Sequence, residues 1–365
     1  MNRRSFTKLS ALALAATRLP AFAQDAPQTG QKPVGFAAVG LGTISDIFMR
    51  ACANTKAAKI TALVTGHPDT KGKHYAELYG IPETSIYTYE TYDRLRDNKD
   101  VDAVYIGLPN SMHREYTLRG AQAGKHVLCE KPMAISSAEC REMIDGCRKA
   151  NVKLMIAYRI HYEPTHLEAK RLIESGAIGQ VESFEGSFGF SAQPGAWRLT
   201  RKLAGGGSLF DVGIYPMNEI RWLTGEEPVG FTAVASTRDH TSGRFAEVEE
   251  TLDFTIKMPS GIQAALGCTY GSSMPGYLRI HGERGTLEIE SAYDYSGVHL
   301  RGLQMRGQRI DITSEGDQTM HFQLEAEHFA NCIRTNTEPQ SPGEEGLHDL
   351  VAIESIYKAA GTPVA

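Results

Sequence analysis

An acid and a phenol stand four residues apart in the sequence, directly behind a run of three glycines. Residues 205–215 read G-G-G-S-L-F-D-V-G-I-Y, in which the acid is Asp211 and the phenol is Tyr215. If this segment is helical, the two side chains lie on one face, one turn apart. A phenol can act as a general base toward a hydroxyl group, and a nearby carboxylate can orient a cation or the substrate. An isolated spacing of this kind is more often a surface helix whose acid and phenol only form hydrogen bonds.

The helix that would carry this pair has a predicted start and end. Ser208 is a suitable N-cap and Gly225 a suitable C-terminal stop, which predicts a helix over residues 209–224. Pro216 cannot donate a hydrogen bond to the carbonyl four residues before it, so we expect a kink beside Tyr215.

A glycine-rich turn near the start of the chain is typical of a dinucleotide site. A strand-like run over residues 34–39 leads into G-L-G-T-I-S at residues 40–45, and a helical stretch over residues 44–54 follows. Ser45 stands where the fingerprint has its third glycine, and it is small enough for close packing. Candidate cofactor-binding residues here are Gly40, Gly42, Thr43 and Ile44.

Further strands and helices alternate behind this turn. Strands are expected at residues 59–64, 103–106 and 126–129, and a helix at residues 71–79. This alternation predicts an α/β fold with a Rossmann-type, doubly wound parallel sheet, which binds ligands at the carboxyl ends of its strands.

The end of the second strand indicates which dinucleotide binds. A site for NAD normally has an acidic residue here, but the chain reads T-G-H-P-D-T-K over residues 65–71. A small hydroxyl, a glycine and a nearby lysine can accommodate a 2′-phosphate, which predicts NADP. Asp69 is the competing candidate, but it precedes a helix, where we expect it to be an N-cap. Candidate ligands of the phosphate are Thr65, Gly66, His67 and Lys71.

Two more loops follow strands of the same predicted sheet. L-P-N-S-M-H occupies residues 108–113 after the strand at 103–106, and E-K-P occupies residues 130–132 after the strand at 126–129. Either could be an ordinary turn, but both stand at ends of strands that lie at one edge of the sheet. The candidate residues of this nicotinamide site are Leu108, Pro109, Asn110, His113, Glu130 and Lys131, and Tyr89 is a further candidate for binding the cofactor.

Short strands of alternating polarity dominate residues 179–311, with 251–257 and 285–290 as examples. They predict an α+β region with an open, largely antiparallel sheet that has one covered and one open face. The open face could be solvent-exposed or support contacts in a homo-oligomer, either a dimer or a tetramer. Helices are expected at residues 321–335 and 344–360.

Composition excludes several partners and sites. The 365-residue chain has a net charge of -5 and no basic run beyond its N-terminus, which argues against nucleic acid as a partner. The six cysteines form no C-x-x-C pair or His/Cys cluster, so we expect no metal site. No apolar run is long enough to span a membrane.

Together, the motifs resemble the Gfo/Idh/MocA oxidoreductase family, and within it the periplasmic glucose–fructose oxidoreductases. The resemblance covers residues 35–363 and rests on G-L-G-T-I-S, L-P-N-S-M-H, A-G-K-H-V-L-C-E-K-P-M, Y-R-I-H-Y-E-P, W-R-L-T-R-K-L-A-G-G-G-S-L-F-D-V-G-I-Y and S-P-G-E-E-G. It implies that Lys131, Asp211 and Tyr215 are catalytic and that the Lys131-Pro132 bond is cis. It also implies that Arg159, Trp197 and Arg198 hold the cofactor or line a sugar pocket.

The resemblance implies an enzyme that oxidises CH–OH groups of sugars. Tightly bound NADP would pass hydride between two sugars, such as glucose and fructose or two aldoses, giving an aldonolactone and an alditol. The alternatives are an ordinary NADP-dependent aldose dehydrogenase that releases NADPH, an NAD-dependent glycosidase and a non-catalytic sugar sensor. The missing acid after the second strand counts against the glycosidase, and the intact catalytic residues count against the sensor.

The expected organisation has five parts. These are a twin-arginine signal peptide at 1–23, a linker arm at 24–33, a dinucleotide-binding domain at 34–157, a substrate and oligomerisation domain at 158–342, and a C-terminal helix and tail at 343–365.

Arg3 and Arg4 precede a short apolar run and an A-F-A cleavage site, as in twin-arginine export signals, which predicts a periplasmic protein. Replacing both arginines by lysine should therefore leave uncleaved precursor in the cytoplasm, measured by fractionation and immunoblotting. Mature protein at the wild-type level in the periplasm would contradict the predicted export route.

Overall fold

Two β-sheets organise the chain, and the computed structural model describes residues 32–304 and 307–362. The predicted export signal at 1–23, nearly all of the predicted linker at 24–33 and residues 363–365 lie outside this part. From Lys32 onward the chain forms one compact unit.

The first sheet has six parallel strands in the order β3-β2-β1-β4-β5-β6. Their bounds are β1 (Val34–Val39), β2 (Ala58–Val64), β3 (Ile86–Tyr87), β4 (Ala103–Ile106), β5 (His126–Glu130) and β6 (Leu154–Ala157). Every residue of β1, β4 and β6 is buried, as expected for parallel strands covered on both faces. The predicted doubly wound parallel sheet is thus confirmed.

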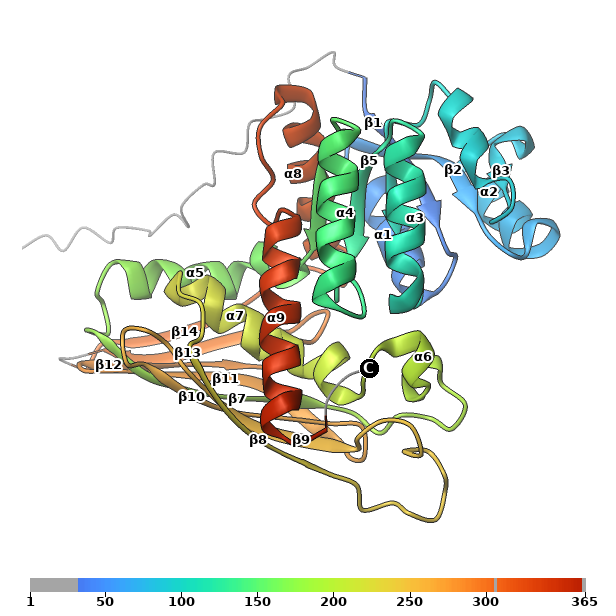
Figure 1. Cartoon of the computed structure of the whole chain (residues 1–365). Helices are drawn as coiled ribbons and strands as arrows, with labels where there is room; N and C mark the ends of the chain where they lie inside the picture. The colour runs from blue at the N-terminus through green and yellow to red at the C-terminus, as the bar shows by residue number, and fades with distance from the viewer. Residues whose placement is uncertain (1–31, 305–306, 363–365) are drawn as a thin grey trace, which may run out of the picture. The chain divides into compact units, whose positions relative to one another are not determined.

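Helices cover both faces of this sheet (Figure 1). On one face α1 (Thr43–Ala53) and α8 (Met320–Thr335) pack around Phe36, whose ring centroid lies 5.5 Å from that of Phe48 and 6.3 Å from that of Phe329. The other face is covered by α3 (Asn110–Gln122) and α4 (Ser137–Lys149). Because α8 comes from the far end of the sequence, it returns the chain to the first sheet.

The second sheet has eight strands in the order β14-β13-β12-β11-β7-β10-β9-β8. Their bounds are β7 (Val181–Gly189), β8 (Gly230–Ser236), β9 (Thr251–Lys257), β10 (Gln263–Thr269), β11 (Met274–Gly282), β12 (Gly285–Glu290), β13 (His299–Gln304) and β14 (Arg309–Thr313). Only β7 and β10 pair in parallel. The largely antiparallel sheet is therefore confirmed, as are the predicted strands that became β9 and β12.

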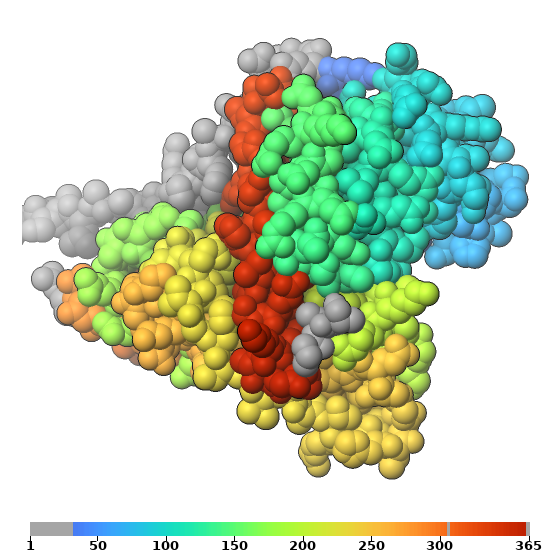
Figure 2. All heavy atoms as spheres, in the orientation of Figure 1, coloured from blue at the N-terminus to red at the C-terminus, as the bar shows by residue number. Residues whose placement is uncertain are grey.

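Helices α5 (Pro164–Glu174), α7 (Ile214–Thr224) and α9 (Gly343–Ala359) share the core with one face of this sheet. The strands alternate accordingly: in β9, Leu252, Phe254 and Ile256 are buried and the residues between them face outward. Figure 2 shows α9 running along the surface beside α4, so this helix touches both halves of the fold.

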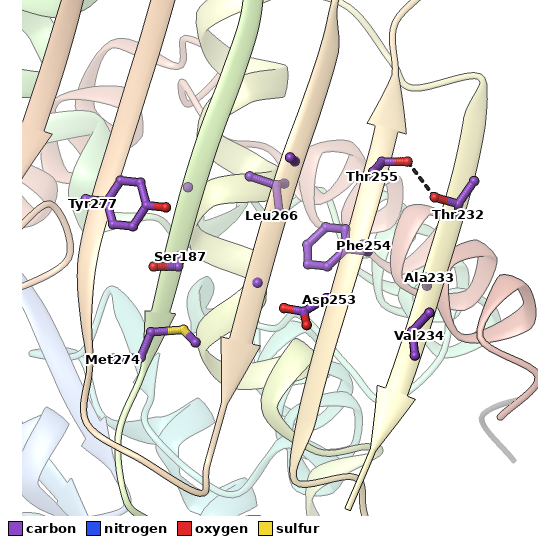
Figure 3. A pocket seen from close by; sticks show the side chains of 13 residues that line it. Ser187, Thr232, Ala233, Val234, Asp253, Phe254, Thr255, Leu266, Met274 and Tyr277 are labelled. Carbon is purple, nitrogen blue, oxygen red and sulfur yellow. Dashed lines mark hydrogen bonds between the residues drawn. The ribbon is translucent and has the colours of Figure 1, made fainter.

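The opposite face of the second sheet has no helix over it in the described part of the chain. Its half formed by β7, β8, β9 and β10 is hollowed over about 590 Å³. Polar side chains such as Ser187 and Thr232 and apolar ones such as Val234 and Met274 line this hollow (Figure 3). Its other half carries a row of alternating charge, because strand register places Asp311, Arg301, Glu288, Arg279 and Glu185 side by side.

The described residues hold no disulfide, no membrane-spanning helix and no cluster of metal ligands. All six cysteines are buried, free thiols. Within residues 32–304 and 307–362, no helix has the length and apolar character to cross a membrane, and no three His, Cys, Asp or Glu side chains gather as metal ligands do.

Candidate active site

The glycine-rich turn lies between β1 and α1, at the edge where the strands of the first sheet end. Gly40 has a φ of +81°, and a Cβ there would stand 2.7 Å from a backbone carbonyl oxygen, so only glycine fits. Gly42 is the N-cap of α1, and no atom lies within 4 Å of the place its Cβ would take. The N-terminus of α1, where Thr43 and Ile44 begin the helix, is thus open to a phosphate group.

The turn after β2 lies against this glycine turn. The Lys71 ammonium donates to the backbone carbonyl of Leu41 at 3.2 Å, so its positive charge stands beside the open N-terminus of α1. Thr65 is buried and its hydroxyl accepts from the N–H of His67 at 3.1 Å, while Gly66 and His67 are exposed. This lysine and these exposed polar groups fit a 2′-phosphate.

Asp69 is not an N-cap, which corrects the expectation from the sequence. The helix begins earlier, as a π turn over Pro68–Gly72 that continues into α2 (Lys73–Tyr79), because Pro68 suits a first helical position. Asp69 is the second residue of that turn and forms an exposed ion pair with Lys73 at 3.3 Å. Its carboxylate is thus engaged away from Thr65.

The two loops after β4 and β5 are tied together by a buried histidine. His113 places Nε2 2.8 Å from the carbonyl oxygen of Leu108 and Nδ1 2.9 Å from that of Pro132. Asn110 donates to the carbonyl of Ala204 at 2.8 Å and so links the first loop to the glycine run. Both side chains hold loops in place, and their contact with a cofactor stays a prediction.

The glycine run leads into a π turn over Leu209–Gly213, not directly into an α-helix, and α7 begins at Ile214. Ser208 stands at the predicted N-cap position and helical residues follow over 209–224 as expected, but Ser208 has helical φ and ψ and its side chain makes no capping hydrogen bond. The Glu249 carboxylate takes its place, since it accepts from the N–H groups of Gly207 at 3.1 Å and Leu209 at 3.3 Å. The predicted stop at Gly225 is confirmed by its left-handed backbone.

The π turn frees one backbone carbonyl for the site. In this wider register the carbonyl of Asp211 would accept from the N–H of residue 216, but Pro216 has none. That carbonyl accepts instead from the Lys131 ammonium at 2.8 Å. The π turn continues into α7 without leaving helical φ and ψ, and the kink expected beside Tyr215 stays a prediction.

Three donors surround the Asp211 carboxylate. Lys131 approaches Oδ1 at 3.2 Å, while Arg198 and Tyr270 donate to Oδ2 at 2.6 and 3.0 Å. Burial alone would raise the pKa of Asp211, but the Lys131 and Arg198 charges hold it well below its ordinary value. Asp211 is therefore an anion that orients the two cations, which the sequence alone had left open.

Tyr215 stands beside the lysine, as predicted. The Lys131 Nζ lies 4.4 Å from the centroid of the Tyr215 ring, and the Lys131-Pro132 bond is cis, as expected. Burial would lower the pKa of Lys131, but the Tyr215 phenol and the Asp211 carboxylate raise it. Lys131 is thus a cation that lies beside the Tyr215 ring.

Arg159 packs against the same phenol from another side. Its guanidinium carbon lies 5.2 Å from the Tyr215 ring centroid and 4.4 Å from that of Tyr295. The guanidinium also donates to the backbone carbonyls of Tyr293 and Asp294. Arg159 therefore fixes the loop that carries Tyr295, and its direct contact with a cofactor stays a prediction.

The other predicted residues line the surroundings. Glu130 is buried and accepts from the hydroxyl of Tyr105 at 2.6 Å, and burial raises its pKa. Trp197 lies under the Arg198 guanidinium, 4.9 Å from ring centroid to carbon. The Tyr89 ring is 3.4 Å from the place of a Cβ on Gly66, so it lies beside the turn after β2. Leu108 and Pro109 lead into α3.

Sequence reasoning missed three residues of the site. Tyr270 follows β10, Tyr295 lies on a loop after β12, and Glu249 precedes β9. Each reaches Asp211, Arg159 or the π turn through the pairing of distant strands, and no motif around it signals that position. Only the pairing of strands in the second sheet places these residues at the site.

Both halves of the chain match known families. Residues 34–158 match the oxidoreductase family with an NAD-binding Rossmann fold, and residues 166–288 match the GFO/IDH/MocA C-terminal domain.

Among curated proteins, D-xylose 1-dehydrogenase [NADP(+)] from Haloarcula marismortui is 32% identical over 90% of this chain and 92% of its own. A trans-1,2-dihydrobenzene-1,2-diol dehydrogenase from Xenopus laevis is 31% identical over 80% of this chain and 87% of its own. Among solved structures, aldose-aldose oxidoreductase from Caulobacter crescentus, complexed with glycerol, is 44% identical with a TM-score of 0.85. That similarity covers 90% of this chain and 98% of that one.

Proposed function

The chain belongs to the GFO/IDH/MocA oxidoreductase family, and we propose that it is an NADP-dependent enzyme that passes hydride between two sugars. The observation that carries the proposal is the Lys131 ammonium, fixed by Asp211 and facing the Tyr215 phenol at the edge where a dinucleotide would bind. The similarity to aldose-aldose oxidoreductase, at 44% identity over nearly the whole of both chains, supports sugars as both substrates.

NADP fits the residues that would hold it. The open N-terminus of α1 and the Lys71 ammonium suit phosphates, and the turn Thr65-Gly66-His67 lacks the acid that would repel a 2′-phosphate. The name of the D-xylose 1-dehydrogenase relative includes NADP(+), which supports the same choice of cofactor. Hydride acceptance is the chemistry that a bound nicotinamide supplies.

The protein's own part is proton transfer. Tyr215 takes the proton of the sugar hydroxyl as hydride leaves the carbon, and Lys131 stabilises the negative oxygen that forms. Asp211 holds Lys131 in place and balances its charge. In the second half-reaction Tyr215 returns the proton to the accepting sugar, as microscopic reversibility requires.

Periplasmic location would make retention of the cofactor necessary. We infer from the twin-arginine motif at residues 1–23 that the protein is exported folded, with NADP already bound. A bound cofactor that is regenerated by a second sugar needs no supply of NADP outside the cytoplasm.

Single-turnover absorbance tests the hydride shuttle. Glucose alone should reduce one protein-bound equivalent of NADP, and fructose or a second aldose should then bleach the reduced band. Steady formation of free NADPH from added NADP, with no effect of a second sugar, would instead identify an ordinary aldose dehydrogenase.

Tyr215→Phe is the matched variant for that experiment, because it removes only the hydroxyl. Loss of the general base should slow reduction of bound NADP by roughly 10² to 10⁴. Release of a chromogenic aglycone by the wild-type protein would favour the glycosidase alternative.

Cofactor choice has its own test at Thr65. Thr65→Asp puts a negative charge where the 2′-phosphate would lie, so preference should move from NADP toward NAD. Thr65→Asn is the control, because it keeps an acceptor for the His67 N–H without the charge. Dissociation constants for both cofactors measure the effect, and equal NADP affinity in Thr65→Asp and Thr65→Asn would place the phosphate elsewhere.

We also propose that the open face of the second sheet binds a second copy of the chain. A reversed copy displaced by one strand would place Asp311 opposite Arg279 and Arg301 opposite Glu288. Val234, which lines the hollow, is 70% exposed (Figure 3). Val234→Lys should therefore lower the molar mass in sedimentation, whereas Val229→Lys, outside the hollow and 66% exposed, should not. A monomeric wild type, or equal masses for both variants, would exclude this interface.

A further inference from the structure

A buried carboxylate on α9 lies outside the site but binds the elements on both sides of Tyr215. Asp349 is fully buried, and it accepts hydrogen bonds from Arg221 and, at 3.1 Å, from Asn218. Both donors belong to α7, the helix that carries Tyr215. The Asp349 carboxylate on α9 therefore holds α7 in place through these hydrogen bonds.

The same carboxylate also binds the segment on the other side of the phenol. The Tyr158 hydroxyl donates to Asp349, and Tyr158 directly precedes Arg159, whose guanidinium lies 5.2 Å from the Tyr215 ring centroid. One side chain thus joins the helix that carries the phenol to the arginine that packs on it.

We propose that Asp349 is a positioning residue that sets where the Tyr215 phenol stands relative to Lys131. The inference rests on the proposed role of Tyr215 as general base. A proton acceptor must lie within hydrogen-bond reach of the reacting hydroxyl, and a misplacement of about 1 Å can cost on the order of 10² in rate.

The charges around Asp349 make its ion pair with Arg221 depend on pH. Arg221 also pairs with Glu345 at 3.0 Å and with Glu227 at 2.7 Å, and Glu227 in turn pairs with His348. Three carboxylates thus share one guanidinium. From the remaining side, the His161 ring hydrogen-bonds the Asn218 amide and stacks on Tyr158 and Trp222, and burial keeps its pKa low and the ring neutral.

Asp349 consequently titrates near neutrality. Burial raises its pKa to about 7, with Glu345 adding to the rise and Arg221 opposing it. A protonated Asp349 loses its charge-assisted bond to Arg221, so positioning of the phenol should weaken as the pH falls below about 7.

Stability should follow the opposite trend. The folded pKa lies above the unfolded value of about 3.9, so this group lowers the free energy of unfolding as pH rises from there to about 7. A purely structural Asp349 would make turnover follow stability, whereas a positioning residue makes turnover fall toward acid while stability increases.

The test compares Asp349→Asn with Glu227→Gln in the full-length, NADP-loaded protein. Glu227→Gln removes a charge from the same arginine, but Glu227 makes no bond to Tyr158 or Asn218. The readouts are the rate of reduction of bound NADP by sugar, the sugar KM, the melting temperature and the pH dependence of each.

Asp349→Asn should slow reduction roughly 10- to 100-fold with an unchanged KM, and it should remove the fall in rate below about pH 7. Glu227→Gln should keep both the rate and that fall. If Asp349→Asn does not fold, Tyr158→Phe, which removes one hydroxyl, should show a smaller loss of the same kind.

Three results would overturn the inference. The first is a wild-type rate in folded Asp349→Asn or, if that variant does not fold, in Tyr158→Phe. The second is an equal loss of rate in Glu227→Gln. The third is a rate that follows the melting temperature across pH. Failure of the proposed function is separate, because it would appear as wild-type reduction by Tyr215→Phe whatever Asp349→Asn does.

Discussion

The contact between the Lys131 ammonium and Asp211 is the constraint around which the two halves of the molecule are arranged. Lys131 follows β5 of the parallel sheet, while Asp211 lies in the π turn under the second sheet. A buried cation without an anion would be costly, so the two sheets must bring Lys131 and Asp211 within hydrogen-bond distance of each other. Hydrogen bonds from His113 and Asn110 to neighbouring loops, together with the contacts of α9, maintain the distance between the two sheets.

The parallel sheet could be predicted from the sequence because its signals are local. An apolar strand leads into glycines and a helix, and even the substitution of Ser45 is explained, since a Cβ on Gly107 would stand 2.4 Å from its hydroxyl. The residues Lys131, Asp211 and Tyr215 stand in motifs of their own, and the structure brings them together as expected.

The errors lie where distant chain segments decide local geometry. Ser208 has the composition of an N-cap, but Glu249, some forty residues later, supplies a stronger acceptor for the same N–H groups. Likewise the partners Tyr270 and Tyr295 reach the site only through strand pairing. Propensity describes a residue by itself. Here the Glu249 carboxylate caps the turn, and strand pairing in the second sheet places the two tyrosines at the site.

The π turn at residues 209–213 has a consequence for how the site responds to substitution. One of the two hydrogen bonds that Lys131 donates to Asp211 goes to the backbone carbonyl, which every amino acid at position 211 would retain. Side-chain scanning therefore removes only part of the contact. The position of the Lys131 ammonium therefore depends on the number of residues between the glycine run and Pro216 as well as on their identity.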